Sequence, residues 1–260
     1  MAIITLTSDL GNDNHYPAVV KGILLSHCPG VTIVDVTHNI PSFDIMQAAY
    51  ALRHAFRAFP AGTTHIVAVD PEQERASRSV LMYHEGHLFI GPDNGVMSLI
   101  AEGVAVEARA IHNETLFLDQ YPRSLRVARV LAPVAAYLAC GGEPTTVGPV
   151  VSLRDLRWGD PTYNGNCLRG KIIHIDKFGN AVTNIRRHNF LEIKQERRFE
   201  IFIRNVRLRR IVNTYSDVAK ADALAIFGES DNLEIAMREA SAAELLGLKI
   251  HDMITIEFSV

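Results

Sequence analysis

The sequence has few cysteines and no long apolar run. Its three cysteines, Cys28, Cys140 and Cys167, are far apart and include no Cys-x-x-Cys pair. This spacing argues against a disulfide framework and against a cysteine zinc site. No apolar stretch is long enough to span a bilayer, and no charged leader with a cleavage-like site precedes the first strand pattern. We therefore expect a cytoplasmic protein without a membrane partner.

The chain also lacks an excess of charge of either sign. Lys and Arg number 26 and Asp and Glu number 29, so the formal net charge is −3. Such a chain has no general attraction to nucleic acid or to an anionic surface. Basic residues cluster only between Arg204 and Arg210, where they alternate with Val206 and Leu208, a pattern typical of the solvated face of a strand. We predict no nucleic-acid partner.

Familiar motifs for phosphate, metal and serine chemistry are missing as well. The sequence has no Walker loop, no Gly-x-Gly-x-x-Gly after a strand and no Gly-x-Ser-x-Gly. Asp9, His15, Asp35 and His38 carry ligand atoms for a metal, but they lack the helical spacing of zinc motifs. We expect no metal. What remains is a polar site with aromatic neighbours, suited to a neutral or cationic organic ligand such as a nucleoside.

What is present is an alternation of strand and helix patterns in the first part of the chain. Apolar runs of strand length alternate with helical patterns at residues 3–8, 16–28, 31–36, 44–59 and 65–70. This alternation predicts a largely parallel sheet with helices on both faces. Two short strand patterns around Glu85-Gly86 predict a hairpin, so the sheet is expected to be mixed. A further helix is predicted from Arg126 to Cys140, before Gly141-Gly142.

The last hundred residues have a different character. From Gly142 to Asn166 the chain is rich in Pro, Gly and Thr, and we place a domain boundary there, with an α/β domain at 1–160 and a β domain at 161–260. One modest helix is expected near residues 240–246. The expected strands are at 171–175, 199–203, 206–211, 223–227 and 253–258. This pattern predicts a small, mainly antiparallel β domain.

Polar residues follow three of the predicted strands. Asp9 follows the first, His38 follows the second, and Asp70 ends the third. Because the carboxyl ends of parallel strands share one edge, where ligands of open α/β sheets bind, we expect these three residues near one another. Asp9 is the first site candidate, although an Asp at this position can also turn the chain or cap the next helix.

A second candidate is the segment from Asp176 to Asn184. Gly179 permits an unusual backbone conformation, Phe178 offers a ring face, and Asp176 and Asn180 offer directional hydrogen bonds. The same pattern also fits a hairpin turn. The residues alone leave both interpretations open.

Seven groups of residues carry a family resemblance when they are taken in series. They are Ser8-Asp9-Leu10-Gly11 with Lys21-Gly22, Val34-Asp35-Val36-Thr37-His38, Val69-Asp70-Pro71, Gly91-Pro92-Asp93-Asn94-Gly95, Ala132-Pro133-Val134-Ala135-Ala136, Asp176-Lys177-Phe178-Gly179-Asn180 and Leu233-Glu234-Ile235-Ala236. In this order they resemble the S-adenosylmethionine (SAM) hydroxide adenosyltransferase family, the SAM hydrolases, whose relatives are fluorinases and chlorinases. The resemblance covers nearly the whole chain.

The resemblance implies an α/β N-terminal domain and a smaller, antiparallel, β-barrel-like C-terminal domain. It also implies a homotrimer, with active sites between the N-terminal domain of one subunit and the C-terminal domain of the next. The implied reaction is attack of water or hydroxide on C5′ of the SAM ribose, which gives adenosine and L-methionine. SAM is then the substrate and no cofactor is needed, because the sulfonium is already an activated leaving group and the protein has to orient the nucleophile and strip its water.

The substrate-binding positions implied by the resemblance come from both domains. In the first domain, Asp9 corresponds to the carboxylate that accepts both ribose hydroxyls, and Phe43 to an aromatic residue against the ribose and adenine. The residues of the second domain that correspond to groups near the methionine end or the adenine are Asp176, Phe178, Asn180, Glu229 and Ser230.

The hydrolases hold the nucleophilic water with a triad of Asp, Arg and His. Asp70 matches the Asp, the Arg position falls on Ser77 with Arg78 beside it, and the His position falls on Arg126. The implied catalytic residues are Asp70, Arg78 and Arg126. Because two triad positions are altered, two alternatives to a hydrolase stay open. One is a SAM- or adenosine-binding protein without turnover, and the other is an adenosyl transferase that uses an anion as nucleophile.

Overall fold

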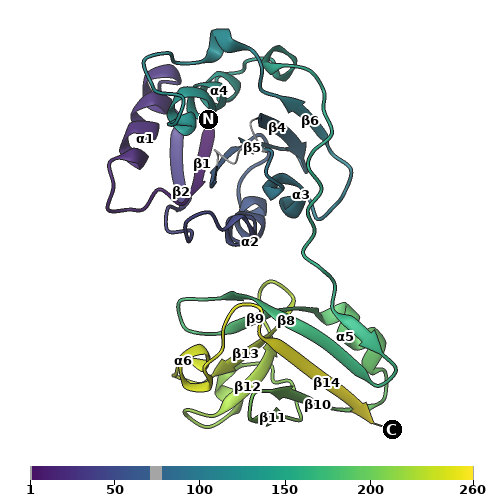
Figure 1. The fold of residues 1–260 in the computed structure, drawn as a ribbon. Helices are drawn as coiled ribbons and strands as arrows, with labels where there is room; N and C mark the ends of the chain where they lie inside the picture. Colours follow the sequence, from purple (N-terminus) through teal and green to yellow (C-terminus); the bar gives the residue numbers. More distant parts are fainter. Residues whose placement is uncertain (1, 71–77, 260) are drawn as a thin grey trace. The chain divides into compact units, whose positions relative to one another are not determined.

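The computed structural model describes residues 2–70 and 78–259 (Figure 1). It divides into two compact units, Met1–Arg157 and Trp158–Val260. In the described ranges, no helix is both long and apolar enough to cross a membrane. Ser77, where the triad arginine of the resemblance falls, lies outside the described residues.

The first unit is built on a six-stranded mixed sheet. Its strands are β1 (Ile3–Ser8), β2 (Thr32–Thr37), β3 (Thr64–Ala68), β4 (Ser79–His84), β5 (His87–Pro92) and β6 (Glu107–Ala110). They lie in the order β2-β1-β3-β5-β4-β6. Neighbours among β2, β1, β3 and β5 pair in parallel, whereas β4 is antiparallel to both β5 and β6. The prediction of a mixed α/β sheet is confirmed.

Helices cover both faces of this sheet. They are α1 (Tyr16–His27), α2 (Ile45–Ala55), α3 (Val96–Ile100) and α4 (Ala132–Ala139). α1 packs with α4, and α2 packs with α3 (Figure 1). Ile4 and Leu6 of β1 are buried in one core with Leu24 of α1. Thr5, between them, bonds to His65 on the other face, as the two-residue period of a strand requires.

The helix predicted from Arg126 to Cys140 is interrupted near its start. The segment Val127–Leu131 is π-helical, and α4 begins only at Ala132, whose N–H bonds to the Val127 carbonyl. Pro133 supplies the reason, because it has no N–H to donate to the Arg129 carbonyl four residues earlier. That carbonyl accepts a hydrogen bond from the Leu118 N–H instead, at 3.0 Å.

Cys28 and Cys140 form a disulfide, so the argument from their spacing against disulfide bonding was wrong for this pair. Cys28 follows the last residue of α1, and Cys140 follows the last residue of α4. The packing of these two helices brings the cysteine Cα atoms to 5.9 Å across 112 residues of sequence. Cys167 is free. The wide spacing along the chain concealed a contact that only the tertiary fold creates.

The second unit is an antiparallel sheet that curves into a nearly closed barrel, as the resemblance implied. Its strands are β7 (Thr162–Asn164), β8 (Cys167–Ile175), β9 (Ala181–Arg186), β10 (Arg198–Ile203), β11 (Val206–Leu208), β12 (Ala223–Phe227), β13 (Asn232–Met237) and β14 (Met253–Ser259). Their order is β11-β10-β14-β8-β9-β13-β12, with β7 beside β8. A bridge between Val212 and Ile226 links the segment after β11 to β12, and so brings the two ends of the sheet together.

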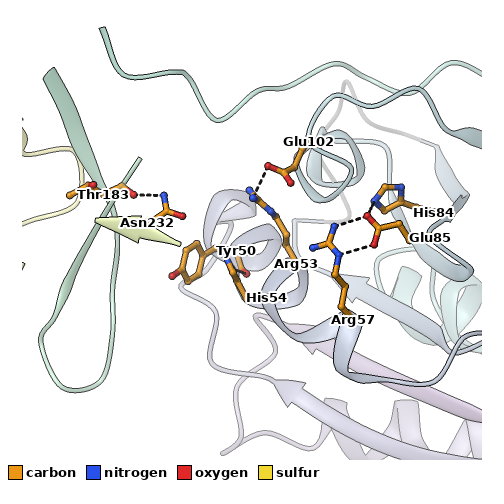
Figure 2. A network of polar contacts seen from close by, with 9 residues as sticks. All are labelled: Tyr50, Arg53, His54, Arg57, His84, Glu85, Glu102, Thr183 and Asn232. Carbon is orange, nitrogen blue, oxygen red and sulfur yellow. Dashed lines mark hydrogen bonds and ion pairs between the residues drawn. The ribbon is translucent and has the colours of Figure 1, made fainter. Parts of the chain in front are cut away.

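This unit contains more regular structure than its sequence pattern predicted. Its described residues form two α-helices, α5 (Arg187–Lys194) and α6 (Ala242–Leu246), where one was expected. α5 gives a weak signal because only Phe190 of its residues is buried. β9 was also missed, because five of its six residues are buried and it shows no alternation. β9 and β13 are joined by a buried hydrogen bond from Asn232 Nδ2 to the Thr183 carbonyl, 2.6 Å (Figure 2).

Buried histidines gather at the amino ends of β3 and β5 in the first unit. His65 is fully buried, with Nδ1 2.7 Å from Thr5 Oγ1 and Nε2 3.2 Å from His87 Nδ1. The rings of Phe56 and Phe89 also contact it. Burial, reinforced by the nearby His87, lowers the pKa of His65 to about 3. His65 is therefore neutral in the folded protein near pH 7.

Ion pairs lie just outside this histidine cluster (Figure 2). Arg57, which follows α2, makes two hydrogen bonds to Glu85 in the β4–β5 turn, at 2.6 and 2.7 Å. Arg53 of α2 pairs with Glu102 at 2.6 Å, and His84 Nε2 lies 3.4 Å from Glu85. Of these contacts, the Arg57–Glu85 pair joins the segment after α2 to the hairpin that the sequence predicted at Glu85-Gly86.

We expect the folded protein to lose stability as pH falls below about 6.5. The unfolded chain protonates His65 at its ordinary pKa, whereas the folded chain does so only near 3, so protons favour unfolding between these values. Between pH 6.5 and pH 5 this one group should lower the free energy of unfolding by about 2 kcal/mol. Denaturant titrations at both pH values measure the loss. His65→Gln should reduce it and His112→Gln, at an exposed position, should not; equal losses in both variants would contradict this account.

Candidate functional site

The parallel strands place the first group of candidate residues at one edge of the sheet. Ser8 at the end of β1 is paired with Ala68 at the end of β3, and Thr7 is paired with Thr37 at the end of β2. Asp9 and His38 follow the ends of β1 and β2 directly, and Asp70 lies two residues beyond the end of β3. The structure thus brings the three residues to the same carboxyl edge, as their positions in the sequence predict.

Asp9 is half-buried and held by a backbone donor. Its Oδ2 accepts the Phe43 N–H at 2.9 Å. Among the described residues, no hydrogen bond to Asp9 Oδ1 is formed, so this oxygen is available to a ligand hydroxyl. Phe43 presents its ring to solvent, with 71% of the residue exposed. The pair thus offers an acceptor and an aromatic face side by side.

Two non-glycine residues at this edge have left-handed backbones. Phe43 has φ 67° and Asp70 has φ 47°. Each conformation costs of order 1–3 kcal/mol, and residues held in this way concentrate at functional sites. Asp70 is 8% exposed, and the buried Asn94 side chain donates to the carbonyls of Val69 and Asp70 at 3.0 and 3.3 Å. Asn94 therefore fixes the backbone that carries the Asp70 carboxylate.

The Gly91–Gly95 turn builds the same edge beyond β5. A Cβ on Gly91 would lie 2.6 Å from the Val67 carbonyl oxygen, so only glycine lets β5 approach β3 this closely. Asp93 Oδ1 accepts the Arg154 N–H at 2.8 Å. The Arg78 guanidinium pairs with Asp93 Oδ2 and donates to the Ser152 carbonyl at 2.7 Å. Arg78, a predicted catalytic residue, thus secures the segment around Ser152 to the sheet.

Arg126 lies at the start of the π-helical segment Val127–Leu131. The residue is half-buried and its Nη1 atom is enclosed, so this nitrogen does not point into solvent. π-helical turns inside α-helices occur frequently at functional sites. The position of Arg126 is consistent with a functional role for its charge.

The second group of candidates surrounds a hollow in the barrel unit. The hollow has a volume of about 620 Å³, which is within the usual range for a small-molecule pocket. Its lining includes Asp176, Phe178, Asn180, Tyr215, Met237 and Ser241. Glu229 and Ser230 lie on the β12–β13 turn and are not part of this lining.

The segment Asp176–Asn180 is both a hairpin turn and a wall of the hollow. Asp176 Oδ1 accepts the N–H groups of Phe178 and Asn180, and Oδ2 accepts Asn180 Nδ2, all at 2.9 Å. Gly179 has φ 82°, and a Cβ there would lie 2.1 Å from Ser241 Oγ. Phe178 is left 77% exposed. The segment therefore forms the hairpin turn that the sequence left open, and its role as a binding segment stays a prediction.

Glu234, on β13, is a residue to which the sequence pattern assigned no role. It is 8% exposed, and its pKa is raised by burial and then by the negative charges of Asp176 and Glu229. Tyr215 donates its hydroxyl to Glu234 Oε2 at 3.4 Å. The sequence feature that could have identified it is the presence of a glutamate within the otherwise apolar run Leu233–Ala236. The carboxylates near the hollow give it a local negative charge that suits a cationic ligand.

No group of three or more His, Cys, Asp or Glu in the described ranges is placed to hold a metal ion. The polar groups at the sheet edge are the carboxylates of Asp9 and Asp70, backbone groups and arginines, and those of the hollow include carboxylates and amides. Each set can hydrogen-bond a polar organic molecule.

Comparisons with known proteins agree with this geometry. Residues 4–148 match the SAM hydroxide adenosyltransferase N-terminal domain, and residues 170–255 match the C-terminal domain of the same family. A relative from Thermus thermophilus named (R)-S-adenosyl-L-methionine hydrolase is 33% identical over 267 residues, which cover 96% of this chain and 97% of the relative.

Two further proteins are similar. A fluorinase from Actinoplanes sp. is 32% identical over 214 residues, covering 71% of this chain and 72% of the fluorinase. The crystal structure of a conserved protein from Thermotoga maritima superposes with a TM-score of 0.88 at 29% identity, covering 98% of this chain and 99% of that one. With both family domains matched in order over most of its length, the chain belongs to the SAM hydroxide adenosyltransferase family.

Proposed function

We propose that this protein cleaves SAM with water or hydroxide and releases adenosine and L-methionine. The observation that carries the proposal is the arrangement of Asp9, which has one oxygen fixed by the Phe43 N–H and the other open at the carboxyl edge of the sheet. The names of the hydrolase relatives support the same reaction. The proposal concerns a single substrate, with no cofactor.

In this proposal Asp9 binds the ribose diol. The Asp9 carboxylate, held in place through Oδ2, accepts the 2′- and 3′-hydroxyls, and hydrogen bonds to a charged group are stronger than those between neutral groups. Phe43 packs against the ribose and adenine with its exposed ring. Together the two residues would orient C5′ of the ribose for in-line attack.

Asp70 and Arg126 have different roles in activating the nucleophilic water. Asp70 orients the water and takes up its proton, and the oxygen forms a bond to C5′ as the C5′–S bond breaks. The electron pair of that bond goes to sulfur, which becomes the neutral thioether of methionine. Arg126 stays charged because its pKa is above about 12, so it cannot act as a general base, but it stabilises the forming hydroxide. Arg78, which pairs with Asp93, supports the edge beside them.

The hollow of the barrel unit would receive the remainder of the substrate. Phe178 offers a face for adenine, and Asn180 and Asp176 offer hydrogen bonds for the adenine edge or the methionine end. The carboxylates of Asp176 and Glu234 attract the methionine ammonium, whereas Glu229 and Ser230 lie on the neighbouring turn. We propose that subunits assemble as a homotrimer and that each site combines the first unit of one subunit with the second unit of the next.

Adenosyl transfer to an anion is a second candidate, favoured by the arginine at position 126 and by the fluorinase relatives. A cation beside C5′ would hold a halide as well as a hydroxide. The retained Asp70 disfavours it, because a carboxylate repels an anion. A protein that binds SAM or adenosine without turnover is the remaining alternative, and the altered triad is the reason to consider it.

The role of Asp9 predicts a preference for adenosine over 2′-deoxyadenosine. Calorimetry on the full-length protein should show that removing the 2′-hydroxyl weakens binding about tenfold or more, because the carboxylate loses a donor. Asp9→Asn should abolish most of that preference, and Asp13→Asn serves as an exposed control. Equal affinity of the wild-type protein for the two nucleosides would remove Asp9 from the site.

Arg126→Ala should lower SAM cleavage by about 10²-fold, the usual effect of removing one preorganised charge stabiliser. Adenosine affinity should change little, because the charge acts on the nucleophile. Chromatography of adenosine and methionine after incubation with SAM gives the rate, and Arg123→Ala, at an exposed position nearby, is the control. Wild-type protein that binds SAM without releasing products would leave the binding-protein alternative in front, and product formation only with added halide would favour the anion alternative.

Sedimentation should report a trimer at the concentrations used for the assays. A site made by two subunits also requires complementation: mixing inactive Asp70→Asn and inactive Phe178→Ala subunits should restore part of the activity, because some mixed sites receive both native residues. A monomer with full activity would contradict the shared site.

A further inference from the structure

Four side chains in contact with one another link the carboxyl ends of β1 and β2. Ser8 Oγ lies 2.7 Å from His38 Nδ1, and His38 Nε2 lies 3.1 Å from Asp35 Oδ1, with its N–H aimed off the line to that oxygen. Lys21 of α1 pairs with Asp35 Oδ2 at 2.5 Å. Ser8 and His38 are buried, at 2% and 3% exposed, whereas Asp35 and Lys21 reach the surface. This row of side chains thus extends from the solvent to the end of β1, which Asp9 follows.

A register shift in β2 brings His38 beside Ser8. Leu6 is paired with Asp35, but Thr7 is paired with Thr37, so β2 holds one extra residue, Val36, at this point. Without the extra residue, Ser8 would face Thr37. Bulges of this kind occur next to active sites, where they redirect a side chain. This one places an imidazole against the last residue of β1.

The donors and acceptors of this row of side chains have one consistent direction. The Asp35 carboxylate favours a proton on His38 Nε2, which leaves Nδ1 to accept the Ser8 hydroxyl proton. Burial acts to raise the pKa of Asp35, but the hydrogen bond from Lys21 and the nearby His38 outweigh it, and the pKa is lowered. Ser8 Oγ also accepts the Leu10 N–H at 3.3 Å. The hydrogen bonds of Ser8 Oγ to His38 and from the Leu10 N–H therefore fix the rotamer of Ser8 and the backbone on both sides of Asp9.

Main-chain hydrogen bonds continue the same connection on either side. The Gly11 N–H donates to the His38 carbonyl at 2.8 Å, and the Ile40 N–H donates to the Ser8 carbonyl at 3.3 Å. The loop that follows His38 then delivers the Phe43 N–H to Asp9 Oδ2. The two strand exits are thus tied together before, at and after the Asp9 position.

We propose that His38 is a positioning residue that sets the location of the Asp9 carboxylate. It acts through Ser8 on the exit of β1 and through its own loop on the Phe43 N–H. The inference rests on the proposed function, in which Asp9 binds the ribose diol. Ser, His and Asp in a hydrogen-bonded row also occur in serine hydrolases, but here Ser8 is buried and its oxygen accepts the Leu10 N–H, so it is not placed to attack a substrate.

The test measures nucleoside discrimination, defined as the Kd for 2′-deoxyadenosine divided by the Kd for adenosine. His38→Ala in the full-length protein should lower this ratio about fivefold to tenfold, because Asp9 no longer meets the diol in fixed geometry. His38→Asn should keep most of it, because an Asn oxygen can take the place of Nδ1 and accept the Ser8 proton. His87→Ala, a buried histidine at the opposite end of the strands, should lower stability without changing the ratio.

A second variant keeps the inference testable if His38→Ala fails to fold. Ser8→Ala removes only the hydroxyl and should also lower the ratio. In the Asp9→Asn background, His38→Ala should lower the ratio no further, since both changes act on one carboxylate. A wild-type ratio in either His38→Ala or Ser8→Ala would overturn the positioning role while leaving the proposed function intact. A ratio of one in the wild-type protein would remove Asp9 from the site and overturn this inference with it, whereas the absence of SAM cleavage is what would overturn the proposed function.

Discussion

The parallel pairing of β1 with β2 on one side and β3 on the other is the constraint on which the first unit depends. Parallel strands all leave the sheet at one edge, so a short polar residue after each strand is enough to assemble a site. The side-chain period of a strand makes this arrangement sensitive, because a slip by one residue would exchange the buried Leu6 with the polar Thr7. Burial of the apolar face therefore fixes the position of Asp9 as well as the fold.

In the barrel unit, carboxyl groups lie close together in partly apolar surroundings. Asp176 is stabilised by the hydrogen bonds of its own turn, and that turn fits against Ser241 only because Gly179 has no side chain. Glu234 has fewer partners and a raised pKa. A cationic ligand beside Glu234 would favour the charged form of that carboxyl group and so oppose the effect of its burial.

The sequence predicted those features that depend on local pattern. The hydrophobic period shows where each strand ends and which polar residue comes next. The sequence therefore predicted the edge with Asp9, His38 and Asp70, and the hairpin at Glu85-Gly86. Features that depend on non-local contacts were not. The disulfide depends on helix packing, and the buried state of Glu234 depends on neighbours in other strands.

The helices show the same difference between features that depend on local pattern and features that depend on non-local contacts. Pro133 was visible in the sequence, yet its effect on the helix depends on Leu118 being present to take the vacated carbonyl. α5 carries too little apolar surface to stand out, because it buries only Phe190. The family resemblance supplied what pattern could not, namely the hypothesis that polar residues of both domains contribute to one site.

The bond between Cys28 and Cys140 changes the topology of the polypeptide itself. With the bond formed, everything from the end of α1 to the end of α4, including β2 through β6, belongs to one covalent ring, and β1 leaves that ring as a tail. A single cut of the backbone within the ring would open it without separating the fragments. The strand that precedes Asp9 therefore stays tethered to its neighbours by covalent bonds as well as by hydrogen bonds, for as long as the cysteines remain oxidised.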